Sequence, residues 1–210
     1  MINLLPNQQL NANKIEKIEK TMNLKTFKSI TLTLLLASIV GCSAAPTHLI
    51  VSPQVSLSPS NQLSGKEAQL NVIDMRTSTH IIQILEKDEA AVILSSEQRL
   101  EDIIQGLLAK QWQQQGLSLS DSANNKVTVT IEKAVISVDQ ESVSYSTQSE
   151  IIIKVSIDNT KQTLTSSFKN RAHSEGALNA DIAVLEREFN QHLSTLIKQI
   201  LTSKDIKTFL

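Results

Sequence analysis

The sequence has few of the residues that staple small folds or carry common catalytic chemistry. Its 210 residues include one cysteine, five glycines and four prolines. One cysteine excludes a disulfide within the chain. With so few glycines, the chain has no glycine-rich phosphate loop and no G-x-S-x-G nucleophile elbow. Neither a phosphate-loop nucleotide enzyme nor an α/β-hydrolase is therefore indicated.

Aromatic side chains and an excess of positive charge are also missing. Phe, Trp and Tyr make up 3% of the chain, and its net charge is −1 at pH 7. A chain without a basic stripe, or basic residues interleaved with aromatics, lacks the footprint of nucleic-acid binding. Sugar-binding modules usually stack aromatic rings on pyranoses, so the shortage of aromatics also counts against a sugar site.

An uncharged, mainly apolar run ends just before the single cysteine. It covers residues 30–40, which is too short for a bilayer-spanning helix of about 20 residues. Lys25 and Lys28 precede it. A basic region, a short apolar region and small residues before a cut are the parts of a secretory signal peptide. The alternative, a buried strand or helix ending at an incidental cysteine, lacks the polar residues expected at a helical period.

The end of this run, Ile39-Val40-Gly41-Cys42, resembles a bacterial lipobox. In that pathway the cysteine thiol receives diacylglycerol, the chain is cut between Gly41 and Cys42, and the new amino terminus is acylated. We therefore predict Cys42 as the lipidation site, with covalent lipid and no other cofactor. Lipidation also accounts for the odd cysteine of a secreted chain.

The start of translation has two readings. Residues 1–21 are polar, so either they extend the basic region or the chain begins at Met22, and residues 22–42 alone already have signal-peptide length. We favour Met22. In both readings residues 1–41 are an extension and signal peptide, residues 42–48 are the lipidated cysteine and a short tether, and residues 49–210 form a single periplasmic domain.

Cleavage leaves 210 − 41 = 169 residues, with 20 − 5 = 15 basic and 21 − 2 = 19 acidic side chains. That length is enough to bury a core without disulfides.

The N-terminal half of this domain predicts three strands and a helix. Residues 49–57, 68–76 and 79–86 alternate as strands do, and Pro53 confines the first to a sheet edge. Residues 58–65 read as a loop. Ser95, with Gln98 three residues on, predicts a capping box at the helix start, and Gly116 suits the position after its end. The helix is indicated by an apolar stripe at Leu100, Ile103, Ile104, Leu107, Leu108 and Trp112.

The C-terminal half predicts a meander and a second helix. Residues 126–138, 143–157 and 163–173 read as strands joined by short polar turns, which favours three antiparallel strands. In the first strand the apolar positions switch from odd to even, which predicts a bulge. The helix spans residues 179–201 with Asn179 as N-cap, and residues 203–210 add a turn. Its stripe is Ile182, Leu185, Phe189, Leu193, Leu196, Ile197 and Ile200.

These elements predict an α+β fold, a two-layer sandwich in which a mostly antiparallel sheet packs against two amphipathic helices. In such a fold Leu107 and Leu196 lie in the middle of the helical stripes, so both are predicted core residues. Glu186 and Lys198 are predicted to face solvent.

The order of several segments resembles the YajG family of outer-membrane lipoproteins of unknown activity. The likeness covers nearly all of residues 22–210 and implies a lipid-anchored location on the periplasmic face of the outer membrane. It brings no catalytic residues, and only Cys42 carries over with a role. Residues 1–21 depart from the family pattern, which also favours Met22. The resemblance rests on the lipobox, VSPQVSL (51–57), DMRT (74–77), SSEQRLEDIIQGLLAKQW (95–112), QQQGL (113–117) and HSEGAL (173–178).

Few residues are candidates for chemistry. His48, His80, His173 and His192 show no H-x-x-x-H or H-x-H spacing, so no metal site is predicted and structural or surface roles are favoured.

Two short segments stand out. Asp74 and Arg76 are predicted to form a local ion pair that closes a turn. Before the last helix, Gly176 is predicted to take a positive φ and Glu175 to cap backbone donors.

Three functions remain open. The leading hypothesis is a non-enzymatic, lipid-anchored binding or accessory module for an envelope protein or cell-wall component, with no nucleic-acid partner. The alternative is a cell-wall or lipid-directed hydrolase whose site forms only in the fold, which two carboxylates at glycosidase separation would favour. A structural lipoprotein without a ligand is the third, and a surface without pockets or apolar patches would favour it.

Overall fold

The computed structural model describes residues 48–210, so the predicted signal peptide and lipobox, with Cys42 and Met22, lie outside the described residues. The elements are β1 (His48–Leu49), β2 (Glu67–Asp74), β3 (His80–Glu86), β4 (Val92–Ser96), α2 (Leu100–Gln114), β5 (Ser118–Leu119), β6 (Lys126–Gln140), β7 (Ser144–Asp158), β8 (Thr163–Ala177), α3 (Ile182–Thr202) and α4 (Lys204–Phe209).

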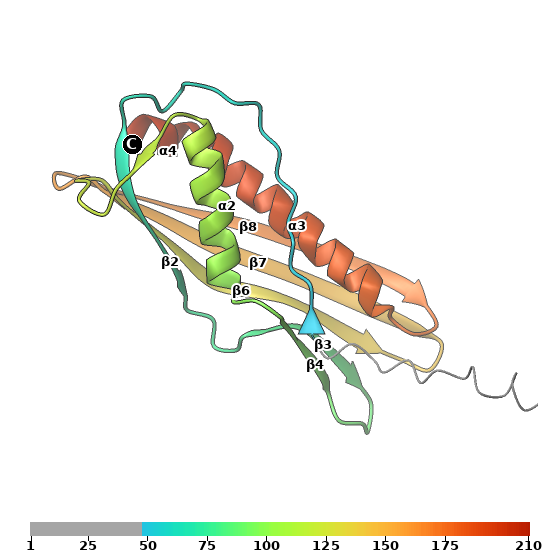
Figure 1. The fold of residues 1–210 in the computed structure, drawn as a ribbon. Coiled ribbons are helices and arrows are strands. Elements are labelled where there is room, and N and C mark those ends of the chain that lie inside the picture. The colour runs from blue at the N-terminus through green and yellow to red at the C-terminus, as the bar shows by residue number, and fades with distance from the viewer. Residues whose placement is uncertain (1–47) are drawn as a thin grey trace, which may run out of the picture. The chain divides into compact units, whose positions relative to one another are not determined.

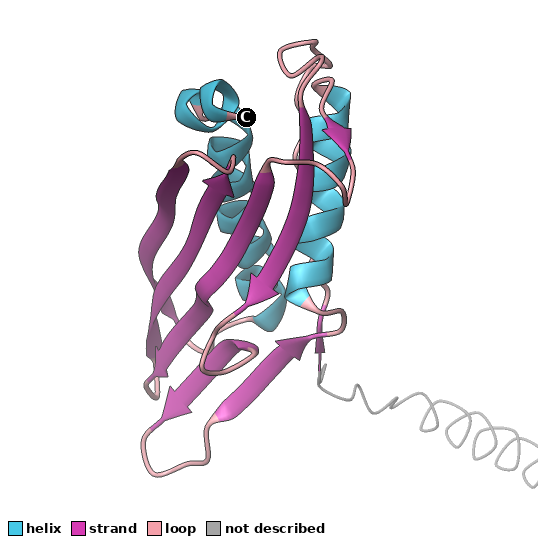
Figure 2. Ribbon diagram, turned by 90° about the vertical axis from the view of Figure 1, so that its left-hand side faces the viewer, coloured by secondary structure: helices cyan, strands magenta, loops and turns pink. Residues whose placement is uncertain are grey.

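The fold has two layers, as predicted. Helices α2 and α3 lie against one face of the sheet and leave the other face open (Figure 1, Figure 2). Burial of the apolar stripes against the sheet forms one core, in which the core-facing apolar side chains of β6 are all buried. Its largest fully buried side chains include Trp112 of α2 and Phe189 of α3.

The sheet is mixed, which corrects the prediction of a mostly antiparallel sheet. Four strand pairings are parallel, β1–β4, β2–β5, β2–β6 and β3–β6, against three antiparallel ones. The reason is topological. Helix α2 carries the chain from β4 across the sheet to β6, which then runs parallel to both β2 and β3. A crossover through a helix produces parallel neighbours, and alternation within a strand does not report direction.

The predicted meander and bulge are confirmed. Strands β6, β7 and β8 are consecutive antiparallel neighbours, and the register of β6 shifts between Ile131 and Lys133. This is the point at which the apolar positions change parity. It also divides the other edge of β6, because β2 pairs with its first half and β3 with its second half.

The predicted strand over residues 49–57 is wrong beyond Leu49. From residue 50 the chain leaves the sheet and runs across the helical layer (Figure 1). Its backbone bonds to α3 side chains: the Ile50 N–H donates to Glu186 Oε2 at 2.8 Å, and the Ser52 N–H donates to Asn190 Oδ1 at 2.8 Å. Glu186 therefore holds the chain, where a solvent-facing side chain was predicted.

The helix α2 starts later than the capping box predicts. Ser95 lies in β4, a strand that the sequence reading missed, and Arg99 is the N-cap without a side-chain hydrogen bond. Gly116 does take a positive φ of 95° after the helix, as predicted. Along the stripe, Leu108 is fully buried and Leu107 is only half-buried, so Leu107 is not the core residue that was predicted.

The helix α3 follows its predicted stripe closely. Leu196 is fully buried and Lys198 is exposed, as predicted. Its N-cap is Asp181 in place of Asn179, since the Asp181 side chain accepts from the Ala183 N–H at 2.8 Å. The predicted final turn is α4.

Candidate functional site

Three chain turns meet at one end of the sheet, which we call the hairpin end: residues 86–91 between β3 and β4, residues 140–143 between β6 and β7, and residues 178–181 before α3. The side chain of Gln140, which is only 6% exposed, links the second and third of these turns. Its Nε2 donates to the carbonyls of Glu141 at 2.7 Å and Leu178 at 3.0 Å, and its Oε1 accepts from the Ala180 N–H at 2.9 Å. A buried amide that satisfies this many backbone groups makes the junction rigid.

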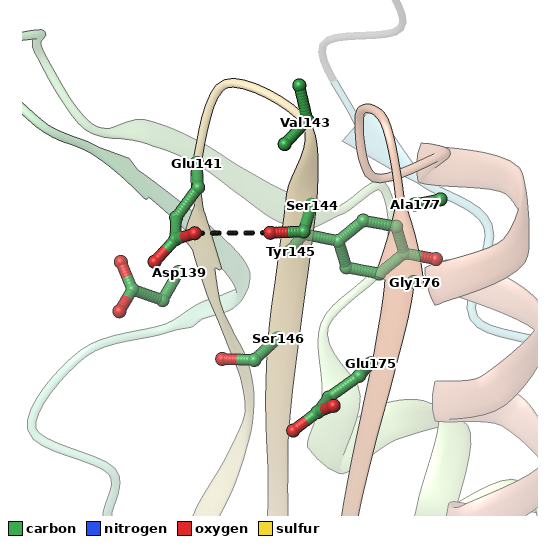
Figure 3. A pocket seen from close by; sticks show the side chains of 9 residues that line it. All are labelled: Asp139, Glu141, Val143, Ser144, Tyr145, Ser146, Glu175, Gly176 and Ala177. Atoms are coloured by element: carbon green, nitrogen blue, oxygen red, sulfur yellow. Dashed lines mark hydrogen bonds between the residues drawn. The ribbon is translucent and has the colours of Figure 1, made fainter.

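Two adjoining hollows open at the hairpin end. One of about 520 Å³ is lined by the ends of β6, β7 and β8, and one of about 770 Å³ lies between β3 and β6. They share Asp139, Glu141 and Val143 (Figure 3). Leu85 lines the second hollow and is 46% exposed, Val143 is 71% exposed, and Leu178 beside it is 70% exposed.

Apolar exposure at this end is accompanied by acidic side chains. Asp139, Ser146 and Glu175 lie in one cross-strand row on the open face (Figure 3). In the adjacent turn, the Ser144 hydroxyl donates to Glu141 Oε2 at 3.1 Å. Glu86 and Asp88 line the second hollow, where Lys87 is the one cation among the lining residues. The hairpin end therefore combines apolar side chains with an acidic rim.

The prediction that Gly176 takes a positive φ and that Glu175 caps backbone donors is wrong. Both lie inside β8, and the positive φ in this region, 64°, belongs to Leu178. Gly176 instead lies beneath the Tyr145 ring, because a Cβ there would overlap that ring (Figure 3). The glycine permits an aromatic side chain to cross over the neighbouring strand, and Glu175 points to the open face.

The predicted Asp74–Arg76 ion pair is confirmed at 2.7 Å, with both side chains largely buried. Arg76 occupies the break between β2 and β3, where it also donates to the Ala134 carbonyl at 3.3 Å. Partial burial acts to raise the pKa of Asp74, but hydrogen bonds from the Arg76 side chain and backbone, with the charges of Arg76 and Arg99, hold that pKa below its ordinary value. The pair has a structural role, since it closes the break in the ladder.

A second charged group crosses the middle of the open face. Glu150 of β7 binds Lys133 of β6 at 2.6 Å and Arg171 of β8 at 2.5 Å. Hydrogen bonds from Lys133 and then Arg171 hold the pKa of Glu150 below its ordinary value. These ion pairs are largely exposed, so they contribute little to the stability of the fold.

The four histidines lie apart. His80 bonds Gln83 Oε1 at 3.1 Å, His173 lies 3.3 Å from Glu175 Oε1, and His192 bonds Ser149 Oγ at 3.0 Å, while His48 is in β1. Within residues 48–210, no three His, Cys, Asp or Glu side chains are arranged to hold a metal ion. In the same residues, no helix has both the length and the apolarity needed to cross a bilayer.

Sequence reasoning missed the residues of the hairpin end. Leu85, Asp139, Glu141 and Val143 stand in or beside short polar turns, and no spacing marks them. The site-specific predictions for Cys42 and for cleavage after Gly41 lie outside the described residues, so they stay predictions.

Comparison with known proteins identifies a similar fold and a family for this chain. The fold is similar to the crystal structure of protein XCC0632 from Xanthomonas campestris, family DUF330, with a TM-score of 0.56, 12% identity, and coverage of 78% of this chain and 97% of that one. At this identity the likeness shows the fold alone. Rare lipoprotein B from Shewanella oneidensis aligns with a TM-score of 0.35 and 13% identity over 61% of this chain and 98% of its own, which is too low to carry an argument.

No curated protein matches the chain. A family model described as "Uncharacterized lipoprotein" does match it, over residues 53–210. This range includes all the described elements after β1. The chain therefore belongs to this family of uncharacterized lipoproteins, and membership implies a lipid anchor that attaches it to a membrane.

Proposed function

We propose that the protein is a lipid-anchored, non-enzymatic binding module of the outer membrane's periplasmic face, and that its hairpin end receives a basic, partly apolar segment of an envelope protein. The exposed apolar side chains Leu85 and Val143, which line the hollows, and Leu178, which lies beside Val143, carry this proposal. Large apolar side chains gathered at one hollowed end, with polar residues around them, are typical of an interaction site. A purely structural lipoprotein would need no such surface. The resemblance to YajG lipoproteins supports the same location.

The charge of the hairpin end selects the class of partner. Carboxylates of Asp139 and Glu141 border both hollows, and Glu86 and Asp88 border the larger one. An acidic rim is repelled by anionic lipid headgroups and attracts lysine and arginine side chains, so it favours a basic protein segment over a membrane surface.

One observation bears on the hydrolase alternative, because Asp139 and Glu175 flank Ser146 in a single row. They are two strands apart, which places their backbones about 10 Å from each other at about 4.8 Å per strand. The glycosidase ranges apply to the carboxyl groups themselves and not to the backbone, so burial of the side chains is the deciding feature. Both side chains are exposed, whereas a general acid needs a desolvated site. The exposure of these two carboxylates therefore favours a binding role over the hydrolase alternative.

Photo-crosslinking in intact cells tests the proposed site. A photoreactive side chain at Val143 should join the protein to a lysine- or arginine-rich segment of one envelope protein. The same group at Lys198, exposed on α3, is the matched control and should give little product. Reversing charge in Asp139→Lys with Glu141→Lys should lower the yield about tenfold, because like charges now oppose the partner. Equal yields from both positions, or crosslinks to phospholipid alone, would contradict the proposal.

Cys42→Ser should release the protein from stable membrane attachment. Each buried lipid methylene contributes about 0.8 kcal/mol, so a single chain binds marginally and two or more bind stably. The variant lacks the thiol that receives diacylglycerol and should accumulate as an uncleaved precursor. Intact mass measures this directly, and a free Cys42 thiol on the wild-type protein would exclude the anchor.

The residue after the anchor should direct the protein to the outer membrane. In many Gram-negative bacteria an aspartate at this position retains a lipoprotein in the inner membrane, and this chain has Ser43. Sucrose-gradient fractionation should place the wild type with outer-membrane markers and Ser43→Asp with inner-membrane markers. A wild type that fractionates with the inner membrane would refute the location.

A further inference from the structure

The strand β8 is a long free edge of the sheet. It covers Thr163–Ala177, pairs with β7 on one side, and has no strand on its other side among residues 48–210. The Leu178 N–H donates to the Val143 carbonyl at 2.9 Å, which fixes the alternation of the ladder. Even-numbered residues of β8 therefore bond to β7, and odd-numbered ones direct their N–H and C=O groups away from the sheet.

This edge has few of the features that normally prevent strands from pairing. Proteins blunt free edges with proline, bulges, short strands or charged residues. The register between β7 and β8 is continuous from Thr163 to Ala177, and β8 contains no proline. Its charged side chains are Lys169, Arg171 and Glu175, all on the open face. Of these, Lys169 makes no ion pair in the described structure, whereas Arg171 is bound to Glu150.

We propose that two copies of the chain pair through this edge, β8 against β8, antiparallel and centred on Ala172. In this register, residue i of one copy lies opposite residue 344 − i of the other. Lys169 then faces Glu175 twice, and Arg171 faces His173. Each odd-numbered residue from Ser167 to Ala177 donates one backbone hydrogen bond to the other copy and accepts one. Opposite charges placed across neighbouring strands stabilise such a pairing.

The side of β8 that faces the helices supports the same register. Centring on Ala172 places Ser174 of the second copy opposite Asn170, so two small polar side chains meet on this side of the strands. Ala172 itself meets Ala172 as a non-hydrogen-bonded pair, whose Cα atoms come to about 4.5 Å. A small side chain suits this close approach.

Neighbouring registers are less favourable. Centring on Asn170 places Lys169 opposite Arg171 twice, so like charges oppose each other. Centring on His173 shortens the overlap and places Glu175 opposite Arg171, which already binds Glu150 at 2.5 Å, so Lys169 stays without a partner. Of these three registers, only the one centred on Ala172 places Lys169 opposite an acidic side chain.

Disulfide trapping tests the pairing in the full chain, expressed with its leader in a Gram-negative host. Ala172→Cys should form a disulfide-linked dimer in the periplasm, because a Cα separation near 4.5 Å lies within disulfide range. Ser166→Cys, on the same side of the same strand, should stay at the background of the wild-type chain. Adding Lys169→Glu to Ala172→Cys should lower the dimer yield about tenfold, since two attractive pairs become repulsive. Adding Glu175→Lys as well should restore it, and Lys161→Glu in the β7–β8 turn should change nothing.

A second measurement needs no introduced cysteine. Lys169 and Glu175 of one copy are six residues apart along an extended strand, about 20 Å, so a zero-length amine–carboxyl crosslink between them can form only between copies. This crosslink should appear in the wild-type protein. The pairing would be overturned if Ala172→Cys stayed at background, if Ser166→Cys dimerised equally, if charge reversal had no effect, or if the edge were joined to a different protein.

Discussion

Replacing Arg76 with methionine should lower the free energy of unfolding by about 3 kcal/mol, the usual cost of removing one partner of a buried ion pair. The change leaves the Asp74 carboxylate without its cation at a position where the Arg76–Asp74 side chains are 4% and 11% exposed. It also removes the donor to the Ala134 carbonyl at the break between β2 and β3. Denaturant unfolding of a soluble form that begins at Ser43 measures the loss.

Arg99→Met is the matched control. Arg99 also forms an ion pair with a carboxylate two residues away, Glu101, but its side chain is 74% exposed. Exposed pairs of this kind contribute little to stability. The denaturant midpoint of Arg99→Met should therefore stay close to that of the wild type, since the Arg99 charge is only the smallest of the contributions that lower the pKa of Asp74. Equal losses from the two variants would show that the Arg76 site is not special.

The cost of Arg76→Met should also depend on pH. The folded pKa of Asp74 is lowered, so its stabilisation is present above the unfolded pKa of about 3.9 and is lost as pH falls through the lower folded value. In the variant, burial without a cation raises the pKa, so ionisation above about pH 4 costs stability. The stability gap between wild type and variant should thus narrow below about pH 4. A gap that stays constant from pH 7 to pH 3 would exclude a charge-based role.

Replacing the buried leucines of the helices with alanine should also lower the free energy of unfolding by a large amount. Leu108→Ala and Leu196→Ala should each cost about 2–5 kcal/mol, because both side chains are fully buried and a cavity remains. Leu107 is next to Leu108 but only half-buried, so Leu107→Ala should cost clearly less. Lys198→Ala, on the exposed face of α3, should stay within about 0.5 kcal/mol. Midpoints measured on the soluble form compare all four, and equal losses at Leu107 and Leu108 would contradict this core.

Features that depend on one buried face could be read directly from the amino-acid order. The stripes of α2 and α3, the three-strand meander and the bulge of β6 each leave a periodic trace, because the side of an element that packs on the core must be apolar at the period of that element. The parity switch in β6 is the clearest case, since it marks the residue where the register shifts. Gly116 after α2 belongs here too, because its positive φ is a local demand.

Other features depend on which distant part of the chain packs against an element. The stripe of α2 contains both Leu107 and Leu108, and only the sheet beneath decides which is fully buried. The alternation of residues 49–57 resembles a strand, but their backbone bonds to Glu186 and Asn190, more than a hundred residues away. Strand direction was missed for the same reason, because α2 as a crossover, and not any local pattern, makes β6 parallel to β2 and β3.

The sequence alone therefore determined the two helices and the meander, whose physical causes are local: an apolar face and a polar turn. Tertiary structure alone decided the candidate site. The hairpin end brings together residues near 86, 140 and 178, and the Gln140 side chain connects the last two by hydrogen bonds that no sequence spacing predicts. Likewise, β8 reads as an ordinary strand, and its free edge exists because the topology of residues 48–210 gives it a neighbour on one side only. Turn residues are polar in any fold, so their meeting at one end follows from the path of the chain and not from their identity.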